Sequence, residues 1–176
     1  MDFYTLRVGK VARKLPVVAL GPKIKVASFN LLGDEELVEI IAQKLLRKLK
    51  GVEFDYLVGP EVKVVPLLHE LSRILGKPKY VVCRKKIHGY MVSPVKSKGR
   101  QGLVLDGRDA RLLKNKKVVI VDDVIFSGYT MRVIKGLMKG IGAKAVMYMA
   151  VFKQGDRTDE DLQDLVYLDT LPVFSS

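Results

Sequence analysis

The chain has 176 residues, 48% hydrophobic and 28% charged, so it is long enough for one well-cored domain and too apolar for wholesale disorder. Its single cysteine, Cys83, excludes an internal disulfide. Because the sequence has no apolar run long enough to cross a bilayer and no signal-peptide pattern, we expect a cytoplasmic protein without a membrane partner. The net charge of +12 indicates either an anionic partner, such as a polyphosphate substrate or nucleic acid, or a very soluble surface.

The N-terminal part predicts a small sheet followed by a helix. Residues 1–32 alternate loosely between apolar and polar side chains, most clearly over residues 23–29, which predicts a half-buried antiparallel strand in a sheet separate from the main one. Acids at residues 34–36 then predict a helix start, because negative charge is favourable in a first turn. The helix ends at Gly51, and its apolar stripe consists of Leu37, Ile40, Ile41, Leu45 and Leu49.

A β-α-β unit is predicted next. It comprises a strand at 54–58, a tight loop at 59–63, a helix at 64–75 and a strand at 79–83. This spacing predicts parallel strands joined by a right-handed crossover. The basic run 84–86 would therefore follow its strand at the same edge of the sheet as the tight loop.

The segment after this unit predicts a loop. Residues 87–101 show no periodicity and are rich in Gly, Ser, Pro and Lys, which is typical of a mobile loop. Residues 102–106 are compatible with a returning strand and residues 109–113 with a short turn or helix. Later extended segments are predicted at 145–152, 165–168 and 171–174.

The most informative stretch runs from Val118 to Met131. Its four β-branched residues at 118–121 predict a strand buried on both faces, and Asp122 and Asp123 follow at the end where open α/β sheets carry their chemistry. A hydroxyl-rich turn at 127–130 then precedes a helix, and backbone N–H groups at such a helix start hold phosphate. The acids can accept hydrogen bonds from vicinal hydroxyls or face a metal. A buried strand whose acids merely cap the next helix is the simpler alternative, which the uninterrupted order of these residue types disfavours.

Three charged clusters are expected on one rim of the sheet. Residues 61–63 and 84–86 would meet the acid pair there. A pyrophosphate group needs backbone amides in a tight turn together with cationic side chains, because its charge must be met after desolvation. Residues 59–63 can supply the amides, and Lys63, Arg84 and Lys85 the charge. Taken alone, Arg84 and Lys85 would favour a solvent-facing strand end, and their position beside the acid pair reverses that preference.

The stretch from Val118 to Met131 closely resembles the phosphoribosyl pyrophosphate (PRPP) signature of the type I phosphoribosyltransferases. Residues 58–67 resemble the pyrophosphate loop of that family, in which a non-proline cis peptide is often seen. Residues 80–85 resemble the strand whose Arg-Lys end contacts pyrophosphate in adenine-type enzymes, and residues 87–101 resemble the loop that closes the site. Two departures are visible: Phe126 stands where most members carry a small or acidic residue, and Tyr129 replaces a frequent glycine.

The resemblance implies a fold and a set of residue roles. The fold is α/β, a twisted, mainly parallel sheet flanked by helices, in a single domain over 1–176 with a core at about 34–155. A small hood would come from about 1–32 and 156–176, and the flexible loop from about 87–101. The implied assignments are Asp122 and Asp123 for the ribose hydroxyls and catalysis; Phe126, Ser127, Gly128, Tyr129 and Thr130 for the 5-phosphate; Glu61, Val62, Lys63, Arg84 and Lys85 for pyrophosphate; Lys96, Lys98 and Arg100 in the flexible loop; and Val124, Phe152 and Lys153 for the base.

The implied reaction is displacement of pyrophosphate from C1 of PRPP by a nitrogen of a purine base. Mg²⁺ would be bound by the pyrophosphate and ribose oxygens near the acid pair, with no direct protein ligand required, and a homodimer is implied. Adenine is favoured because hypoxanthine-guanine enzymes often carry an acid where Phe126 stands. Lys153 points the other way, since those enzymes place a lysine there to meet the purine 6-oxygen.

Three other functions stay open. The first is a 6-oxopurine enzyme for hypoxanthine, guanine or xanthine. The second is a PRPP-sensing regulator that binds nucleic acid without catalysis, which the charge permits but the short chain disfavours. The third is a pyrimidine-type or catalytically degraded member.

Overall fold

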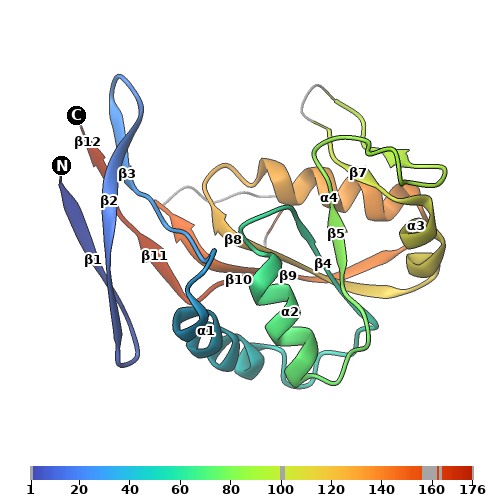
Figure 1. Cartoon of the computed structure of the whole chain (residues 1–176), viewed down its shortest axis with the longest axis horizontal. Helices are drawn as coiled ribbons and strands as arrows, with labels where there is room; N and C mark the ends of the chain where they lie inside the picture. The colour runs from blue at the N-terminus through green and yellow to red at the C-terminus, as the bar shows by residue number, and fades with distance from the viewer. Residues whose placement is uncertain (1, 100–101, 156–161, 163, 176) are drawn as a thin grey trace.

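Two sheets organise the protein, one in the middle of the chain and one built from both of its ends (Figure 1). The computed structural model describes residues 2–99, 102–155, 162 and 164–175. The central sheet has the strand order β10-β9-β8-β4-β5, with β11 also pairing with β9, and every pairing in it is parallel. This arrangement confirms the predicted α/β fold. Its strands are β4 (Tyr56–Pro60), β5 (Val81–Cys83), β8 (Lys117–Ile125), β9 (Lys144–Gln154), β10 (Leu165–Val166) and β11 (Asp169–Leu171).

The second sheet, called here the terminal sheet, is antiparallel and has the order β1-β2-β3-β12. A bidentate contact ties it to the central part of the protein. Arg13 donates to the carboxylate of Asp34 at 2.6 and 2.8 Å and to Glu36 at 2.9 Å, which joins a strand to the start of the first helix. The strands of the terminal sheet are β1 (Phe3–Val8), β2 (Val11–Gly21), β3 (Ile24–Ala27) and β12 (Val173–Ser175).

Helices cover both faces of the central sheet, so its strands are buried on two sides. Val119 and Val121 of β8 pack in one core cluster with α1 and α2, while Val118 and Ile120 pack in a second cluster with α3 and α4. A strand with this double burial must be apolar on both faces, as the run of β-branched residues predicted. The helices are α1 (Glu35–Lys48), α2 (Val65–Ile74), α3 (Gly107–Leu113) and α4 (Tyr129–Gly140).

The first predicted helix is confirmed, together with the reason for its start. Asp34 is the N-cap of α1, and its side chain accepts a hydrogen bond from the backbone N–H of Leu37 at 3.2 Å. None of the described helices is long and apolar enough to span a membrane.

The strand β8 differs from its prediction in length. It continues through both acids to Ile125, because β9 supplies pairing partners as far as Lys153. Asp122 and Asp123 therefore belong to a paired strand and do not cap the following helix.

The predicted loop also contains more structure than expected. Residues 95–96 form β6 (Val95–Lys96), which pairs with β7 (Val104–Leu105). The backbone N–H of Gly107 donates to the carbonyl of Val92 at 2.9 Å. The backbone at Val92 is therefore held against the start of α3.

Candidate functional site

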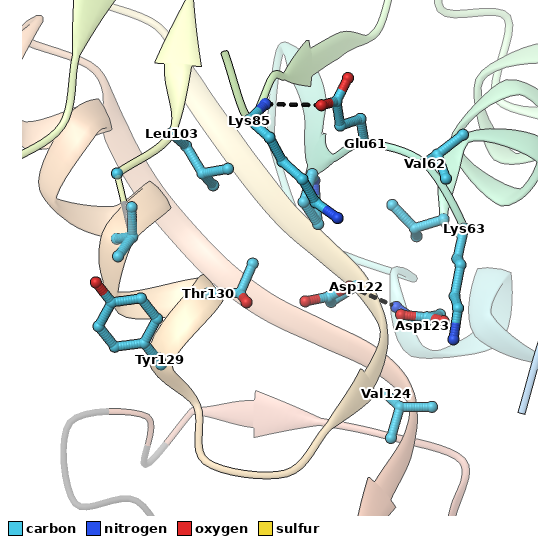
Figure 2. Close-up of a pocket in the computed structure, with 14 residues that line it drawn as sticks. Glu61, Val62, Lys63, Lys85, Leu103, Asp122, Asp123, Val124, Tyr129 and Thr130 are labelled. Atoms are coloured by element: carbon cyan, nitrogen blue, oxygen red, sulfur yellow. Dashed lines mark hydrogen bonds between the residues drawn. The ribbon is translucent and has the colours of Figure 1, made fainter. Parts of the chain in front are cut away.

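A cavity of about 560 Å³ opens where β4 and β8 reach their C-terminal ends. We call it the main cavity. Figure 2 shows the acid pair near its centre, the loop after β4 on one side and the start of α4 on the other. The structure thus brings three sequence-predicted clusters to one place, as expected when parallel strands end at a common edge. The members that line the cavity are Glu61, Val62, Lys63, Lys85, Asp122, Asp123, Val124, Tyr129 and Thr130.

The two carboxylates are buried although they are charged groups. The exposed fractions of Asp122 and Asp123 are 7% and 9%, and the backbone N–H of Asp123 donates to Oδ1 of Asp122 at 2.9 Å. Burial raises the pKa of Asp122 well above its usual range, and the negative charge of Asp123 raises it further, while the charge of Lys63 acts in the opposite direction. This site therefore favours a ligand that donates hydrogen bonds or brings positive charge.

The loop after β4 is fastened to the end of β5 through Glu61. Its Oε1 accepts from the backbone N–H of Lys85 at 2.8 Å, and its Oε2 lies 3.6 Å from Nη1 of Arg84. The backbone N–H of Glu61 also donates to the carbonyl of Cys83 at 2.8 Å, and the Glu61–Val62 peptide bond is cis. Arg84 is thus engaged by Glu61, while Lys85 points into the main cavity (Figure 2).

Lys63 is held from the opposite direction. Its Nζ donates to the carbonyl of Phe29 at 3.2 Å, and the side chain runs beside Asp123 (Figure 2). Phe29 precedes α1, so a residue from the N-terminal part of the chain orients a cation of the site. The sequence carried no signal for this contact, because it joins residues 34 positions apart.

Gly59 allows β4 to approach β8 closely at the floor of the site. A Cβ atom at this position would lie 2.6 Å from the carbonyl oxygen of Val121 and 3.0 Å from side-chain atoms of Leu68 and Val64. A larger residue would push the loop after β4 away from the acid pair. The glycine is therefore required by packing and not by a turn.

The far side of the main cavity is the N-terminus of α4. Gly128 is the N-cap with a φ of +68°, and the backbone N–H of Tyr129 lies 3.4 Å from Oγ of Ser127. Thr130 points into the cavity and Tyr129 lies at its edge (Figure 2). Free N–H groups and the positive end of a helix dipole make such a position suitable for a phosphate.

Of the residues predicted to bind the 5-phosphate, only Tyr129 and Thr130 line the main cavity, and Phe126 lies apart from them. It lines a separate cavity of about 630 Å³ that also involves Gln154, Leu171 and Pro172 near the terminal sheet. The Gln154 amide is fixed by a 2.7 Å hydrogen bond from its Nε2 to the carbonyl of Pro172. We call this the Phe126 cavity.

Only one of the three predicted base-binding residues, Val124, lines the main cavity. Phe152 is 2% exposed, and its ring meets that of Phe29 edge-on at 4.8 Å between centroids. The ammonium of Lys153 lies 6.0 Å from the centroid of the Tyr167 ring. The structure therefore does not bring Phe152 and Lys153 to the main cavity.

The predicted flexible loop contributes differently from expectation. Lys96 and Lys98 are exposed and do not line the main cavity, and Arg100 lies outside the described residues. Gly102 and Leu103 line it instead, with the N–H of Leu103 donating to Oγ of Ser97 at 2.8 Å. Neither residue was predicted to be in the site, because both follow the loop and carry no charge.

Within the described residues, no group of three or more His, Cys, Asp or Glu side chains could hold a metal ion. The acid pair supplies hard carboxylate oxygens of the kind that Mg²⁺ binds, but only from two side chains. A divalent cation here would take further oxygens from a ligand or from water.

Comparisons with known proteins agree on the family type and differ on the base. The sequence profile of the phosphoribosyl transferase domain matches residues 32–175. The chain is 30% identical over 140 residues to a hypoxanthine/guanine phosphoribosyltransferase of Methanopyrus kandleri, a match that covers 76% of this chain and 72% of that protein.

Two solved structures extend the comparison. Adenine phosphoribosyltransferase from Thermoanaerobacter pseudethanolicus has a TM-score of 0.69 at 19% identity, covering 96% of this chain and 95% of that one. Purine phosphoribosyltransferase from Pyrococcus horikoshii has a TM-score of 0.55 at 26% identity, covering 76% and 82%.

Proposed function

Because this chain belongs to the phosphoribosyl transferase domain family, we propose that it converts PRPP and a purine base into a nucleoside monophosphate and pyrophosphate, with adenine as its main substrate. The family makes it a phosphoribosyltransferase, that is, a pentosyltransferase. The observation that carries the proposal is the buried acid pair between a helix N-terminus and a loop flanked by cations, all in one cavity.

The order of groups across the main cavity supports one orientation of PRPP. The 5-phosphate would occupy the start of α4, where Tyr129 and Thr130 lie. The two ribose hydroxyls would donate to Asp122 and Asp123, and the pyrophosphate would reach the loop after β4. This order follows the chemistry of each side, with backbone donors for the phosphate and buried acceptors for the hydroxyls.

The cations on the pyrophosphate side suit a leaving group that gains negative charge. Lys85 points into the main cavity, and Lys63 is oriented by its bond to Phe29 at 3.2 Å. Bond breaking at C1 develops positive charge on the ribose and negative charge on the pyrophosphate. The work of the protein is then to position both reactants, stabilise the departing charge and exclude water, a task for which we propose the segment 87–101 as a cover.

Mg²⁺ is part of the proposal as a companion of PRPP. The fit rests on two carboxylates of the main cavity, Asp122 and Asp123, with the remaining oxygens from the substrate. When bound, the ion would neutralise pyrophosphate charge. A homodimer is also proposed, and sedimentation of the full chain tests it.

The choice of base rests on two residues with opposite implications. Phe126 supplies no acid near the end of β8, which supports adenine. The name of the Methanopyrus kandleri relative supports a 6-oxopurine such as hypoxanthine or guanine, and so does the cation Lys153 by its position at the end of β9, although its side chain does not line the main cavity. We propose adenine first and the 6-oxopurine activity as the second candidate.

Incubating the protein with PRPP, Mg²⁺ and each nucleobase separately, and separating the products by chromatography, tests both candidates. Adenosine monophosphate as the main product is the expected result. A 6-oxopurine nucleotide instead would select the second candidate. No product from any base, together with salt-sensitive binding of RNA or DNA, would overturn the enzymatic proposal in favour of a regulator.

A further inference from the structure

A smaller cavity lies away from the main one, where the turn between β1 and β2 meets the C-terminal half of α1 (Figure 1). Its volume is about 280 Å³, and it shares no lining residue with the main cavity. We call it the basic cavity because four cationic side chains line it, namely Arg7, Lys44, Arg47 and Lys48.

The lining residues of the basic cavity include four cations and a single acid, Asp169. Within the part of the chain that the structure describes, none of them forms an ion pair, whereas Arg13 on the neighbouring strand binds two carboxylates. The three on α1 have i, i+3 and i+4 spacing, so they share one face of the helix and repel one another. Such a cluster is unfavourable in isolation and favourable around an anion.

Helix stability accounts for only part of this cluster. Arg47 and Lys48 stand in the last turn of α1, where positive charge is favourable next to free carbonyl groups. Lys44 lies a full turn earlier, and Arg7 comes from β1. Helix stability therefore does not explain why cations from α1 and β1 both line the basic cavity.

The interior of the basic cavity differs from a flat charged surface. Its walls include Val8 and Phe152, which are buried, and the half-buried Leu168. Its one acid, Asp169, already accepts from the backbone N–H of Thr170 at 2.8 Å through Oδ1, and the second carboxylate oxygen can accept a hydrogen bond from a hydroxyl group. Apolar walls, a cationic rim and a single acceptor suit a small molecule that carries both phosphate and hydroxyl groups. The volume of about 280 Å³ lies just below the usual range of ligand sites, about 300–1,000 Å³, which favours a small ligand over a polymer.

We propose that the basic cavity is a second ligand site, which binds a small phosphorylated metabolite of the size of a sugar phosphate or mononucleotide. Arg7, Lys44, Arg47 and Lys48 bind its phosphate, and Asp169 accepts from a hydroxyl. The proposal does not depend on the reaction at the main cavity, because the two sites have separate residues.

The test is a site-resolved titration of the full chain labelled with ¹⁵N. Inorganic phosphate, ribose 5-phosphate, adenosine monophosphate and a short RNA oligonucleotide are added separately, and the amide signals of Gly9 and Leu168 are followed by NMR. The signals of Gly128 and Thr130 report the main cavity in the same spectra. The double variant Arg7→Gln/Arg47→Gln is compared with Lys14→Gln/Lys139→Gln, which removes two charges from a strand of the terminal sheet and from the last turn of α4.

The expected result is saturable movement of the Gly9 and Leu168 signals, tighter for ribose 5-phosphate or the nucleotide than for inorganic phosphate. Arg7→Gln/Arg47→Gln should weaken this binding by about tenfold or more, because it removes charge-assisted hydrogen bonds, and the control pair by less than about twofold. Equal weakening by both pairs would mean general attraction and overturn the proposal. So would the absence of saturable movement, or a response to an RNA oligonucleotide alone.

Discussion

Replacing Asp122 by asparagine separates two effects of the buried acid pair. One is its unfavourable effect on the stability of the fold, and the other is its contribution to the use of PRPP. The substitution keeps the size and the Oδ1 acceptor, so the 2.9 Å bond from the N–H of Asp123 can persist. It removes a negative charge from a side chain that is 7% exposed and adjacent to a second carboxylate. Without ligand, the variant should therefore be more stable than the wild type, while its use of PRPP should fall.

The magnitudes follow from the chemistry of the site. Stabilising substitutions of this kind contribute about 0.5–2 kcal/mol, which in a domain of this size raises the melting temperature by about 1–8 °C. A hydrogen bond from a ribose hydroxyl to a charged acceptor contributes about 1.5–3 kcal/mol, so kcat/KM for PRPP should fall by about 10- to 150-fold.

The stability gain should depend on pH in a defined direction. Because the pKa of Asp122 is raised on folding, the folded wild type binds more protons than the unfolded chain between the two pKa values, and it loses stability as pH rises through that window. Below the unfolded pKa the carboxyl is protonated in both states and the advantage of asparagine disappears.

Differential scanning calorimetry at pH 4, 6 and 8, without PRPP or Mg²⁺, measures the stability difference, and steady-state kinetics measures the loss of activity. Asp2→Asn, at an exposed position, is the matched control and should change neither. A variant less stable than the wild type at pH 8, or one with unchanged turnover, would refute the reasoning.

Three other predictions concern the floor of the site, the base and the cysteine. Gly59→Ala should lower the free energy of unfolding in urea by about 1–3 kcal/mol, because its Cβ would lie 2.6 Å from the Val121 carbonyl oxygen. Gly136→Ala is the control and should be neutral or stabilising, because nothing lies within 4 Å of its Cβ. Similar effects at both sites would contradict this prediction. Because the Lys153 ammonium lies 6.0 Å from the Tyr167 ring centroid and outside the main cavity, Lys153→Met should change kcat/KM by less than about twofold for both adenine and hypoxanthine, and a selective loss of about tenfold for hypoxanthine would show that Lys153 reaches the base. Burial raises the pKa of Cys83 to about 12, so the thiol should resist iodoacetamide at pH 8 until urea unfolds the chain, and rapid labelling of the native protein would contradict its burial.

The local sequence pattern was sufficient to predict most helices and strands and to group the residues of the main cavity. Asp34 caps α1, with Glu35 and Glu36 in the first turn, and the run Val118–Val121 is buried on both faces. Parallel strands must end at one edge, so the loop after β4, the end of β5 and the acid pair could be grouped without coordinates.

Contacts between distant segments were beyond the reach of the sequence. Phe126 is three residues from Asp123, yet it lines a different cavity, because the strand β8 continues past the acids. Phe152 stands at the end of a predicted strand, and only the packed structure shows its ring against Phe29.

What the sequence determined by itself was the fold class, the acid pair and the hydroxyl-rich turn before α4, because each depends on residue types within a few positions of one another. What the tertiary structure decided was which cations the site can use. Arg84 is engaged by Glu61, Lys63 is oriented by Phe29, and Arg7 joins the cations of α1 in a second cavity. These arrangements depend on the packing of remote segments, which no local pattern records.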